Sequence, residues 1–531
     1  MARSGSSGRS YEATPQDAPL VFAIDKQGLA KLRKSKVMVA GATADASIRR
    51  IKHVYYDTHD KRLARRGLSF NILHTDGRFV QTVTAGAADD AGATPIVSET
   101  EVSGLTPQMD AIAEPDVRDR LGFIAPGTLE TVFTIDVQRE QRLIEVRAGG
   151  QSSFISVAVD TGEITSECSG APVAEPISEI QMELIKGSRL ALFRLALDWL
   201  KAAPLVLHSN RRPERGLELS EGRPPPWVKS NVVRLDPSMT VEDAMSHIFS
   251  GCLTQITANQ AAVLEGRDPE GVHQFRIAVR RLRSAFTTFG PLLAGQALDR
   301  LKDDARWVIQ SLNAARDWDV FLTELLPPVV DGSDGASFTA LEHGARAACA
   351  AGYDQARSML HDDRYTRFML ELGLWVLERG WRREATAESI ERLEASITGY
   401  ASPLLSKRHK TALKRGKGFD EQTAEERHQV RIALKKLRYL LEFFEALFPS
   451  HKTKNYLSTL KSMQDDLGHL NDVATAERLV MALMDRSKAD APVEMAYASG
   501  RLIGWYAHGI QSSEVHARRD WKALKKSEPF W

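Results

Sequence analysis

Two segments of this 531-residue chain carry the same spacing of histidine and basic side chains, at an offset of 155 residues. A helix advances about 100° per residue, so positions 0, +3, +7 and +10 share an arc of roughly 80°. Each segment therefore predicts a helix with one basic stripe, and the fixed offset predicts a duplicated unit. The first stripe is His273, Arg276, Arg280 and Arg283, and the second stripe is His428, Arg431, Lys435 and Arg438.

Such stripes are suited to binding an anion. We expect no acidic partner at i+3 or i+4 within either stripe, and like charges one turn apart repel by a few tenths of a kcal/mol per pair. An external anion would offset this repulsion. The alternative is a solvated face whose charges pair with acids on other helices. The duplication favours the anion site.

A third basic segment precedes the second stripe. Residues 407–417 hold six lysines and arginines, and no acid follows them before Asp420. We expect this segment to extend the anion site, with a solvated helix end as the alternative. The residues expected to bind are Lys407, Arg408, Lys410 and Lys414.

The repeated pattern resembles the CHAD domain, the conserved-histidine α-helical domain. The resemblance runs from about Ser238 to Trp531 and includes Arg316-Asp317-Trp318-Asp319-Val320 and the closing Phe530-Trp531. It implies two four-helix bundles related by pseudo-twofold symmetry, with basic helices facing a shared groove that binds inorganic polyphosphate. Asp317 and Asp472 occupy equivalent places at the same offset, and we expect them to orient the arginines or to cap the following helix.

Residues 18–220 have a different pattern, in which short strand-like segments dominate. Phe133–Gln138, Gln141–Arg147 and Phe154–Asp160 are examples, and residues 160–163 (Asp-Thr-Gly-Glu) predict a turn. Many strands and few helices predict an antiparallel barrel. The segment Tyr55–Leu68 resembles the CYTH, or triphosphate tunnel, family, as do residues 159–164 and 179–184.

The CYTH resemblance implies a lumen that binds a metal ion and a triphosphate. Active members hold a divalent cation on Glu-x-Glu strands, because residues i and i+2 of a strand share one face. Matching residues here would hold Mg²⁺ or Mn²⁺ only if the barrel is active, and Arg139 and Arg212 remain as possible phosphate contacts. The candidate metal ligands are Glu99, Glu101, Glu179 and Glu183.

Several basic positions of the CYTH pattern are lost. Asn71, Leu73, Thr84 and Asp136 stand where cations are expected, and the opening Glu-x-Glu-x-Lys is absent. A lumen that keeps carboxylates and loses cations would repel a triphosphate. We therefore expect a catalytically degenerate barrel kept as a scaffold or for another ligand, with its glutamates equally explained as solvent-facing strand residues. The alternative is a metal-dependent inorganic triphosphatase whose helical domain anchors polyphosphate.

Composition and segment boundaries complete the predicted organisation. With 43% hydrophobic and 26% charged residues and a net charge of +1, the chain is typical of globular proteins, and its basicity is local. The three cysteines lack metal-ligand spacing. We expect an α+β protein with a disordered lead without a secretory signal (1–17), a barrel (18–220), a proline-rich linker (221–237) and an all-α domain (238–531).

The expected partners and location follow from this organisation. We expect the protein to bind polyphosphate without a cofactor, to bind no specific nucleic acid and no membrane, and to be cytoplasmic at polyphosphate granules. The sequence leaves the oligomeric state open.

Overall fold

The computed structural model describes two compact units. It covers residues 19–86, 96–125, 127–148, 150–230, 233–293, 295–331, 338–487 and 493–531, so the expected disordered lead lies outside the described residues. The first unit runs to Trp227 and includes residues 260–267 and 361–374, and the second holds Val228–Asn259, Asp268–Leu360 and Trp375–Trp531. No described helix is long and apolar enough to cross a membrane.

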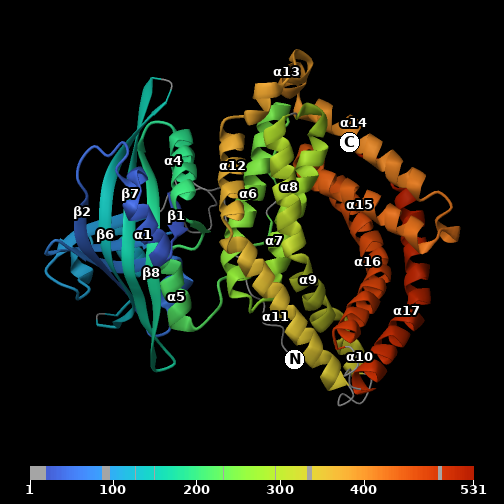
Figure 1. Cartoon of the computed structure of the whole chain (residues 1–531), viewed down its shortest axis with the longest axis horizontal. Helices are drawn as coiled ribbons and strands as arrows, with labels where there is room; N and C mark the ends of the chain where they lie inside the picture. Colours follow the sequence, from blue (N-terminus) through green and yellow to red (C-terminus); the bar gives the residue numbers. More distant parts are fainter. Residues whose placement is uncertain are drawn as a thin grey trace. The chain divides into compact units, whose positions relative to one another are not determined.

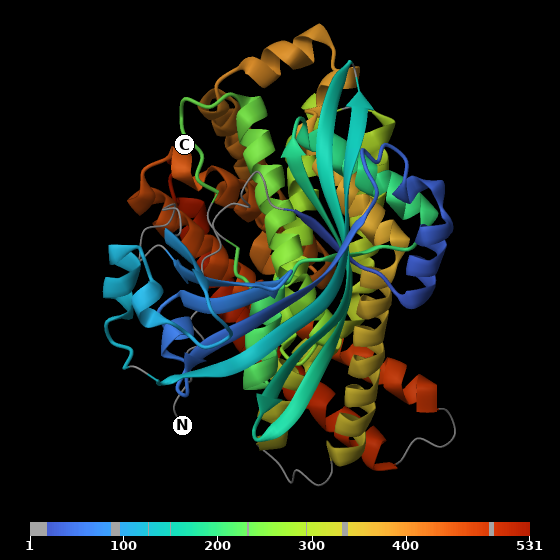
Figure 2. The same cartoon turned by 90° about the vertical axis from the view of Figure 1, so that its left-hand side faces the viewer.

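The first unit is built on one antiparallel sheet of nine strands, in the order β5-β4-β3-β2-β6-β7-β8-β1-β9 (Figure 1). Figure 2 shows the long strands β6, β7 and β8 twisting across the shorter ones. The prediction of an antiparallel β domain is confirmed. The strands are β1 (Leu20–Ala23), β2 (Ser47–Thr58), β3 (Leu68–Thr75), β4 (Arg78–Ala85), β5 (Ile96–Val102), β6 (Leu129–Ala148), β7 (Gln151–Cys168), β8 (Ala171–Lys186) and β9 (Val206–His208).

Two predicted interruptions of this sheet are wrong. Strand β6 continues through residues 139–140, and β7 continues through the predicted turn at 160–163. Gly162 pairs with Val137, and a Cβ built on Gly162 would lie 2.0 Å from the Asp136 carbonyl oxygen. The glycine therefore permits two backbones to approach closely within a ladder, which is a recognised use of glycine in strands.

Five α-helices accompany the sheet in the described part of residues 19–227. They are α1 (Lys26–Lys34), α2 (Arg62–Arg65), α3 (Pro115–Leu121), α4 (Arg189–Ala202) and α5 (Arg212–Glu221). Helix α5 packs against β6 and β7. A Cβ on Gly216 would lie 2.2 Å from the Phe133 ring, so α5 lies directly on the face of the sheet to which Phe133 points.

The helical unit repeats itself at the predicted offset. Helix α7 (Pro269–Thr288) and helix α15 (Ala424–Phe444) begin 155 residues apart, as do the short turns at Gly290 and Glu445 that follow them. The first and fourth helices of each copy correspond as well. They are α6 (Val241–Glu265) with α14 (Ile397–Arg415), and α11 (Thr339–His361) with α17 (Val493–Lys526).

The third helix differs between the copies. In the first copy it is divided into α8 (Gln296–Ser311) and α9 (Asn313–Val320), whereas in the second copy α16 (Ser450–Ser487) is continuous. Three shorter helices belong to the first copy and the connection to the second. They are α10 (Pro327–Asp331), α12 (Asp363–Leu377) and α13 (Ala387–Glu394).

Equivalent positions of the two copies meet each other. Phe289 and Phe444, which correspond at the offset of 155, contact edge to face with ring centroids 6.4 Å apart. The segments preceding α6 and α14 also pair, because Val241 N donates to Ala395 O at 2.9 Å and Ile397 N donates to Met239 O at 3.1 Å. These contacts between equivalents confirm the predicted pseudo-twofold arrangement of two four-helix units.

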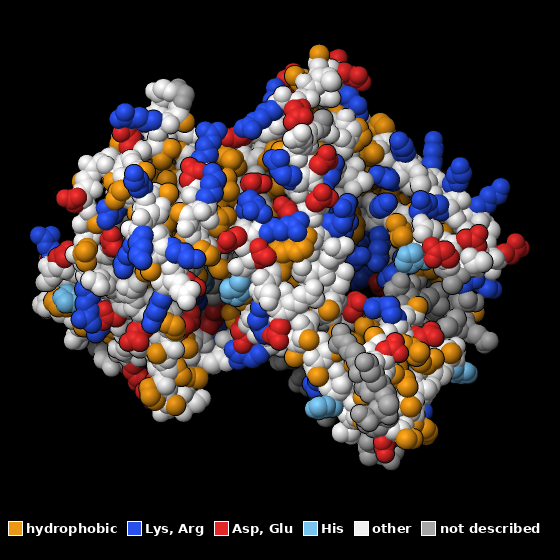
Figure 3. Space-filling model, viewed as in Figure 1, with side chains coloured by type: hydrophobic (Ala, Val, Ile, Leu, Met, Phe, Trp, Pro, Cys, Tyr) orange, Lys and Arg blue, Asp and Glu red, His pale blue; other side chains and the backbone are white. Residues whose placement is uncertain are grey.

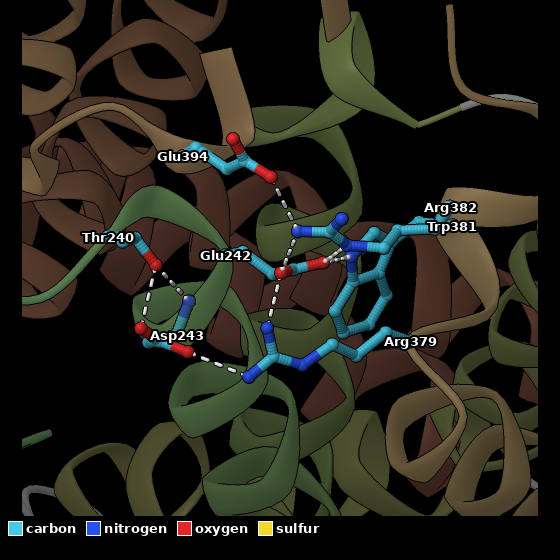
Figure 4. Close-up of polar contacts among 7 residues, drawn as sticks. All are labelled: Thr240, Glu242, Asp243, Arg379, Trp381, Arg382 and Glu394. Atoms are coloured by element: carbon cyan, nitrogen blue, oxygen red, sulfur yellow. Dashed lines mark hydrogen bonds and ion pairs between the residues drawn. The ribbon is translucent and has the colours of Figure 1, made fainter. Parts of the chain in front are cut away.

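A buried ion network fixes the start of α6 to the segment that follows α12 (Figure 4). Glu242 accepts hydrogen bonds from Trp381 Nε1 at 2.7 Å and from both Nε and Nη2 of Arg382, at 2.6 and 2.7 Å. Burial alone would raise the pKa of Glu242, but these donors and Arg379 hold it below its usual range. Position 397, the equivalent of Glu242, is an isoleucine. The network therefore belongs to the first copy alone.

Candidate anion-binding site

The first stripe lies on α7, opposite the face that this helix buries. Asp268 caps the helix by accepting from Glu270 N at 2.9 Å, and Pro269 occupies the first turn, where its missing N–H is not needed. Phe275, Val279 and Leu282 are fully buried. His273 and Arg276 are half-buried, and Arg280 and Arg283 are exposed.

Arg276 is held by neutral groups. Its Nη1 donates to the Asn313 side chain and, at 3.5 Å, to the Ile309 carbonyl. Burial and the nearby charge of Arg280 lower the pKa of Arg276 to about 10, although Asp317 opposes the shift. The guanidinium therefore stays cationic at neutral pH, and the two groups to which it donates carry no charge.

Other cations surround the first stripe. Burial lowers the pKa of His273, and the charge of Arg316 lowers it further. Partial burial also lowers the pKa of Arg283, as do the charges of Arg306 and Arg280. Arg316 and Arg306 have acidic neighbours of their own, at 3.3 Å (Glu324) and 2.8 Å (Asp303). Within the described part of the chain, Arg280 and Arg283 form no ion pair.

The second stripe lies on α15, whose first turn is fixed by a capping box between Thr423 and Glu426. His428 is exposed, and Arg431 and Lys435 are half-buried. A Cβ built on Gly468 would lie 3.8 Å from Nη2 of Arg431, so this guanidinium reaches α16.

Arg438 contradicts one expectation about the second stripe. Its Nε donates to Glu442 Oε1 at 2.9 Å, and its Nη1 donates to Gln464 Oε1 at 3.0 Å. The prediction that no acid stands at i+4 is therefore wrong here, because Glu442 lies just beyond the end of the stripe. The second stripe is partly neutralised at this end.

The helices that carry the two stripes are neighbours, since α7 packs against α15. Arg281, which is 7% exposed, lies over the Phe443 ring at 5.7 Å from its centroid. Tyr439 of α15 is near enough to Arg276 to influence its pKa. The structure thus brings the first stripe beside residues of the helix that carries the second.

A row of lysines lies on α14, which packs against α15. A hollow of about 540 Å³ is lined by Lys407, Lys410 and Lys414 together with Pro403, Ser406 and Thr411. The three lysines are exposed, and none forms an ion pair with a described residue. Figure 3 shows Lys and Arg side chains gathered over α14 and in the hollow beside α15 and α16. We call Lys407, Lys410 and Lys414 the lysine face.

The two neighbours of this row point elsewhere. Arg408 is half-buried and does not line the hollow. His409 is buried and its Nδ1 lies 2.5 Å from the Tyr456 hydroxyl. Only three of the four residues predicted for this segment therefore share one surface.

In the first unit, the candidate metal ligands are not gathered. Glu99 and Glu101 are exposed on β5, Glu183 is exposed on β8, and Glu179 is buried at 3% exposure. Among the described residues, no three His, Cys, Asp or Glu side chains are grouped so that they could hold a metal ion. The residues present do not fit the divalent cation that the CYTH resemblance implies.

The arginines of the sheet are already paired with carboxylates. Arg139 donates to both oxygens of Asp160 at 2.8 and 2.7 Å, and Arg212 lies 2.7 Å from both Asp160 and Glu179. Arg215 is paired with Glu179 and, at 2.6 Å, with Glu175. Although burial raises the pKa of Asp160 and of Glu179, these arginines hold both pKa values below the usual range.

Comparison with known proteins matches the helical unit. The CHAD domain family matches residues 247–480. The crystal structure of the CHAD domain from the plant Ricinus communis is 33% identical, with 56% of this chain and 98% of that chain covered and a TM-score of 0.49. The chain belongs to the CHAD-domain family.

Two further solved structures are more distantly similar. PptA from Streptomyces chartreusis is 17% identical over 54% of this chain and all of that chain (100%), with a TM-score of 0.42. A putative adenylyl cyclase from Hippeastrum, whose dominant activity is described as that of a triphosphatase, is 12% identical over 38% of this chain and 95% of that chain, with a TM-score of 0.25.

Within the CHAD domain, Asp317 forms an ion pair between the two copies. It accepts from Arg478 Nη2 at 2.8 Å, which joins α9 to α16. The expected contact of an acid with the first stripe is seen only as the influence of Asp317 on the pKa of Arg276. The side chain of Asp472 lies outside the described residues.

Sequence reasoning missed the part that Arg306 and Arg316 play beside the first stripe. Arg316 directly precedes Asp317 in the quoted CHAD motif, so its position was a usable signal. Arg306 stands on α8 three residues from Asp303 and carries no motif, and only the packing of α7 against α8 brings it near Arg283.

Proposed function

We propose that this protein binds inorganic polyphosphate through a cationic surface of its CHAD domain, formed by the first stripe, the second stripe and the lysine face. The observation that carries the proposal is the group of exposed cations without an ion pair to a described residue. Arg280 and Arg283 of α7 belong to this group, and the lysine face supplies the other three. Exposed like charges gathered in this way favour an external polyanion.

The chemistry of the surface suits a polymer of phosphates. Arginine presents a planar fork that binds phosphate oxygens in pairs, and lysine supplies a compact charge with three donors. Lys407, Lys410 and Lys414 stand at spacings of three and four, so they follow one side of α14 and can contact successive phosphates. Binding by fixed side-chain cations requires no cofactor.

Specific nucleic-acid binding is not part of the proposal. Single-stranded nucleic acid is bound without sequence preference by aromatic side chains on which bases stack, in addition to basic grooves. The described residues that line the hollow at the lysine face include no aromatic side chain. We propose that the protein works in the cytoplasm and concentrates at polyphosphate granules.

The alternative function, a metal-dependent triphosphatase in the barrel, is disfavoured by specific contacts. A triphosphate needs unmatched cations, whereas Arg139 and Arg212 are engaged with Asp160 and Glu179. We therefore propose a catalytically degenerate barrel. Release of phosphate from triphosphate with Mg²⁺ or Mn²⁺ at about 1 s⁻¹ or faster, within the usual enzyme range, would contradict this. Loss of this phosphate release in the Glu99→Gln variant would assign the activity to the barrel.

The proposed function is tested by titrating the full chain with long-chain polyphosphate in a calorimeter. We compare the native protein with a variant in which Arg276, Arg280, Arg283, Arg431, Lys435 and Arg438 are all alanine. We expect an affinity loss of at least about a hundredfold, roughly 2.7 kcal/mol. Single-stranded DNA of equal charge should compete weakly. Equal binding by both proteins would overturn the proposal.

A matched control removes three exposed arginines that already have acidic partners. Arg50, Arg147 and Arg346 pair with Asp136, Glu145 and Glu342, and their side chains are 76%, 77% and 67% exposed. Their replacement by alanine should leave the affinity nearly unchanged, because none of the three belongs to the proposed surface. The fold should also be retained, because exposed ion pairs contribute little to stability. A comparable loss in this variant would show a general charge effect.

A further inference from the structure

One face of the sheet in the first unit lines a partly open cavity whose walls are largely apolar. Its volume is about 340 Å³, and Ile51, Leu73, Ile135 and Val137 form much of the lining. Helix α5 contributes Arg212 to it. Pairing of β2 with β6 sets Ile51 beside Val137 and His53 beside Ile135, so these residues share one face of the sheet. Polyphosphate binding by the CHAD domain makes no use of this cavity.

Among the arginines that line the cavity, Arg49 alone has no carboxylate partner in the described part of the chain. Arg139, Arg212 and Arg215 are paired with Asp160, Glu175 and Glu179. The remaining lining cation is Arg49, whose Nη2 donates to the neutral Gln141 side chain at 2.8 Å. Carboxylates thus compensate Arg139 and Arg212, whereas Arg49 meets only a neutral group among the described residues.

Two polar atoms at the cavity lack hydrogen-bond partners. Arg49 Nε and Thr75 Oγ1 are buried, and no described residue accepts from or donates to either atom. Both residues line the cavity. A buried donor without a partner costs about 1–3 kcal/mol, so a ligand that supplied acceptors to both would gain by satisfying them.

The other polar groups of the lining carry no charge. Burial lowers the pKa of His53, and the nearby Arg139 and Arg212 lower it further, against a hydrogen bond with Asn71. Burial raises the pKa of Tyr55 to about 12, and its ring stacks on Phe133 with centroids 4.4 Å apart. At neutral pH these groups can form hydrogen bonds but cannot match additional negative charge.

We propose that this cavity binds a small monocarboxylate with an apolar body. Arg49 would receive the carboxylate on Nε and a terminal nitrogen, in the paired geometry that guanidinium favours. The Thr75 hydroxyl would donate to one of the same oxygens, and the apolar body would lie against Ile51, Leu73 and Val137. A triphosphate does not suit the site, because several negative charges would face one uncompensated arginine among largely apolar walls.

The charge requirement can be tested without any variant. The full chain is titrated by calorimetry with 4-phenylbutyrate and with its neutral counterpart, 4-phenylbutyramide. We expect the carboxylate to bind at least about tenfold more tightly, and inorganic triphosphate not to displace it. Equal affinities, no binding of the carboxylate at millimolar concentration, or competitive displacement by triphosphate would overturn the proposal.

Variants then locate the site. Arg49→Gln should weaken 4-phenylbutyrate at least about tenfold and leave the amide unchanged, and Leu73→Trp should weaken both by filling the cavity. Arg50→Gln is the matched control, because Arg50 is the next residue of β2, points to the opposite face and pairs with the half-buried Asp136 at 2.8 Å. Unchanged binding in Arg49→Gln with an unchanged melting temperature would refute the assignment. Polyphosphate affinity should be the same in all three variants, so failure here leaves the proposed function standing.

Discussion

The face of the sheet that lines the cavity and the basic surface of the CHAD domain both carry several arginines, but the charges of these arginines are compensated differently. In the sheet, Asp160 binds Arg139 and Arg212, and the latter also binds Glu179. In the CHAD domain, Arg276 donates to an amide and a carbonyl, and the exposed Arg280 pairs with no described acid. The arginines of the sheet are compensated by carboxylates of the same fold, whereas those of the CHAD domain can contact a ligand.

Burial explains why the two regions differ. Removing a charge from water costs several kcal/mol, and an opposite charge close by offsets much of that cost. Asp160 is fully buried, and its two arginines are the groups that keep it ionised. A charge at the surface stays hydrated and can remain beside like charges at a cost of tenths of a kcal/mol. Arginine is therefore expected to contribute to the stability of the sheet and to ligand binding by the CHAD domain.

The largest expected effect is the loss of a buried carboxylate from the sheet. Asp160→Asn leaves Arg139 and Arg212 without their shared partner, and breaking a buried pair in this way typically destabilises by about 3–5 kcal/mol. Arg280→Ala should change stability by less than about 0.5 kcal/mol, because it removes an exposed side chain from a helix. Differential scanning calorimetry of the full chain measures both. Equal losses in the two variants would remove the distinction between the regions.

A smaller effect is expected from the lysine face. Replacing Lys407, Lys410 and Lys414 by alanine should weaken polyphosphate binding about tenfold, roughly 1.4 kcal/mol. It should also make the dependence of affinity on salt shallower, by analogy with counterion release from nucleic acid. Binding isotherms measured at salt concentrations from about 50 to about 300 mM give both the affinity and its dependence on salt. An unchanged salt slope would exclude these lysines from the contact surface.

The smallest effect concerns pH. Burial and Arg316 lower the pKa of His273, so this side chain is neutral in the free protein at pH 7. A bound polyanion favours the protonated form and raises that pKa, so affinity should rise as the pH falls from 7 to 5.5, by about two- to threefold for one histidine. His273→Gln should remove this part of the pH dependence. If the variant and the native protein give parallel pH profiles, His273 does not contact the ligand.

The sequence predicted the duplication well, because the offset of 155 residues is a property of the chain alone. It predicted a helix with a basic stripe in each copy, and these helices are α7 and α15. It could not predict the barrel ion pairs, which join positions 21 and 33 residues apart, Arg139 with Asp160 and Arg212 with Glu179. Those pairs depend on strand register and on the docking of α5, which no local pattern of residues encodes.

Two further predictions failed for different reasons. Arg438 is the last member of the second stripe, and the helix continues far enough for Glu442 to reach it. Residues 160–163 have the composition of a turn, yet Gly162 lies within a ladder. The partner strand leaves no room for a side chain there, which explains the glycine. The pair of Arg438 with Glu442 is local and could have been read from the sequence, because the two residues stand four apart on one helix. The strand at residues 160–163 is decided by tertiary context.

The central claim is that the two stripes bind one polyphosphate chain together. Calorimetry of two triple variants tests it, with Arg276, Arg280 and Arg283 replaced by alanine in one and Arg431, Lys435 and Arg438 in the other. Helicity should be retained, since alanine is the best helix former. A chain held by both stripes gains effective concentration at the second once it has bound the first. Each variant should therefore bind at least about tenfold more weakly, with the native stoichiometry. Half the native stoichiometry at native affinity in each variant would contradict the account.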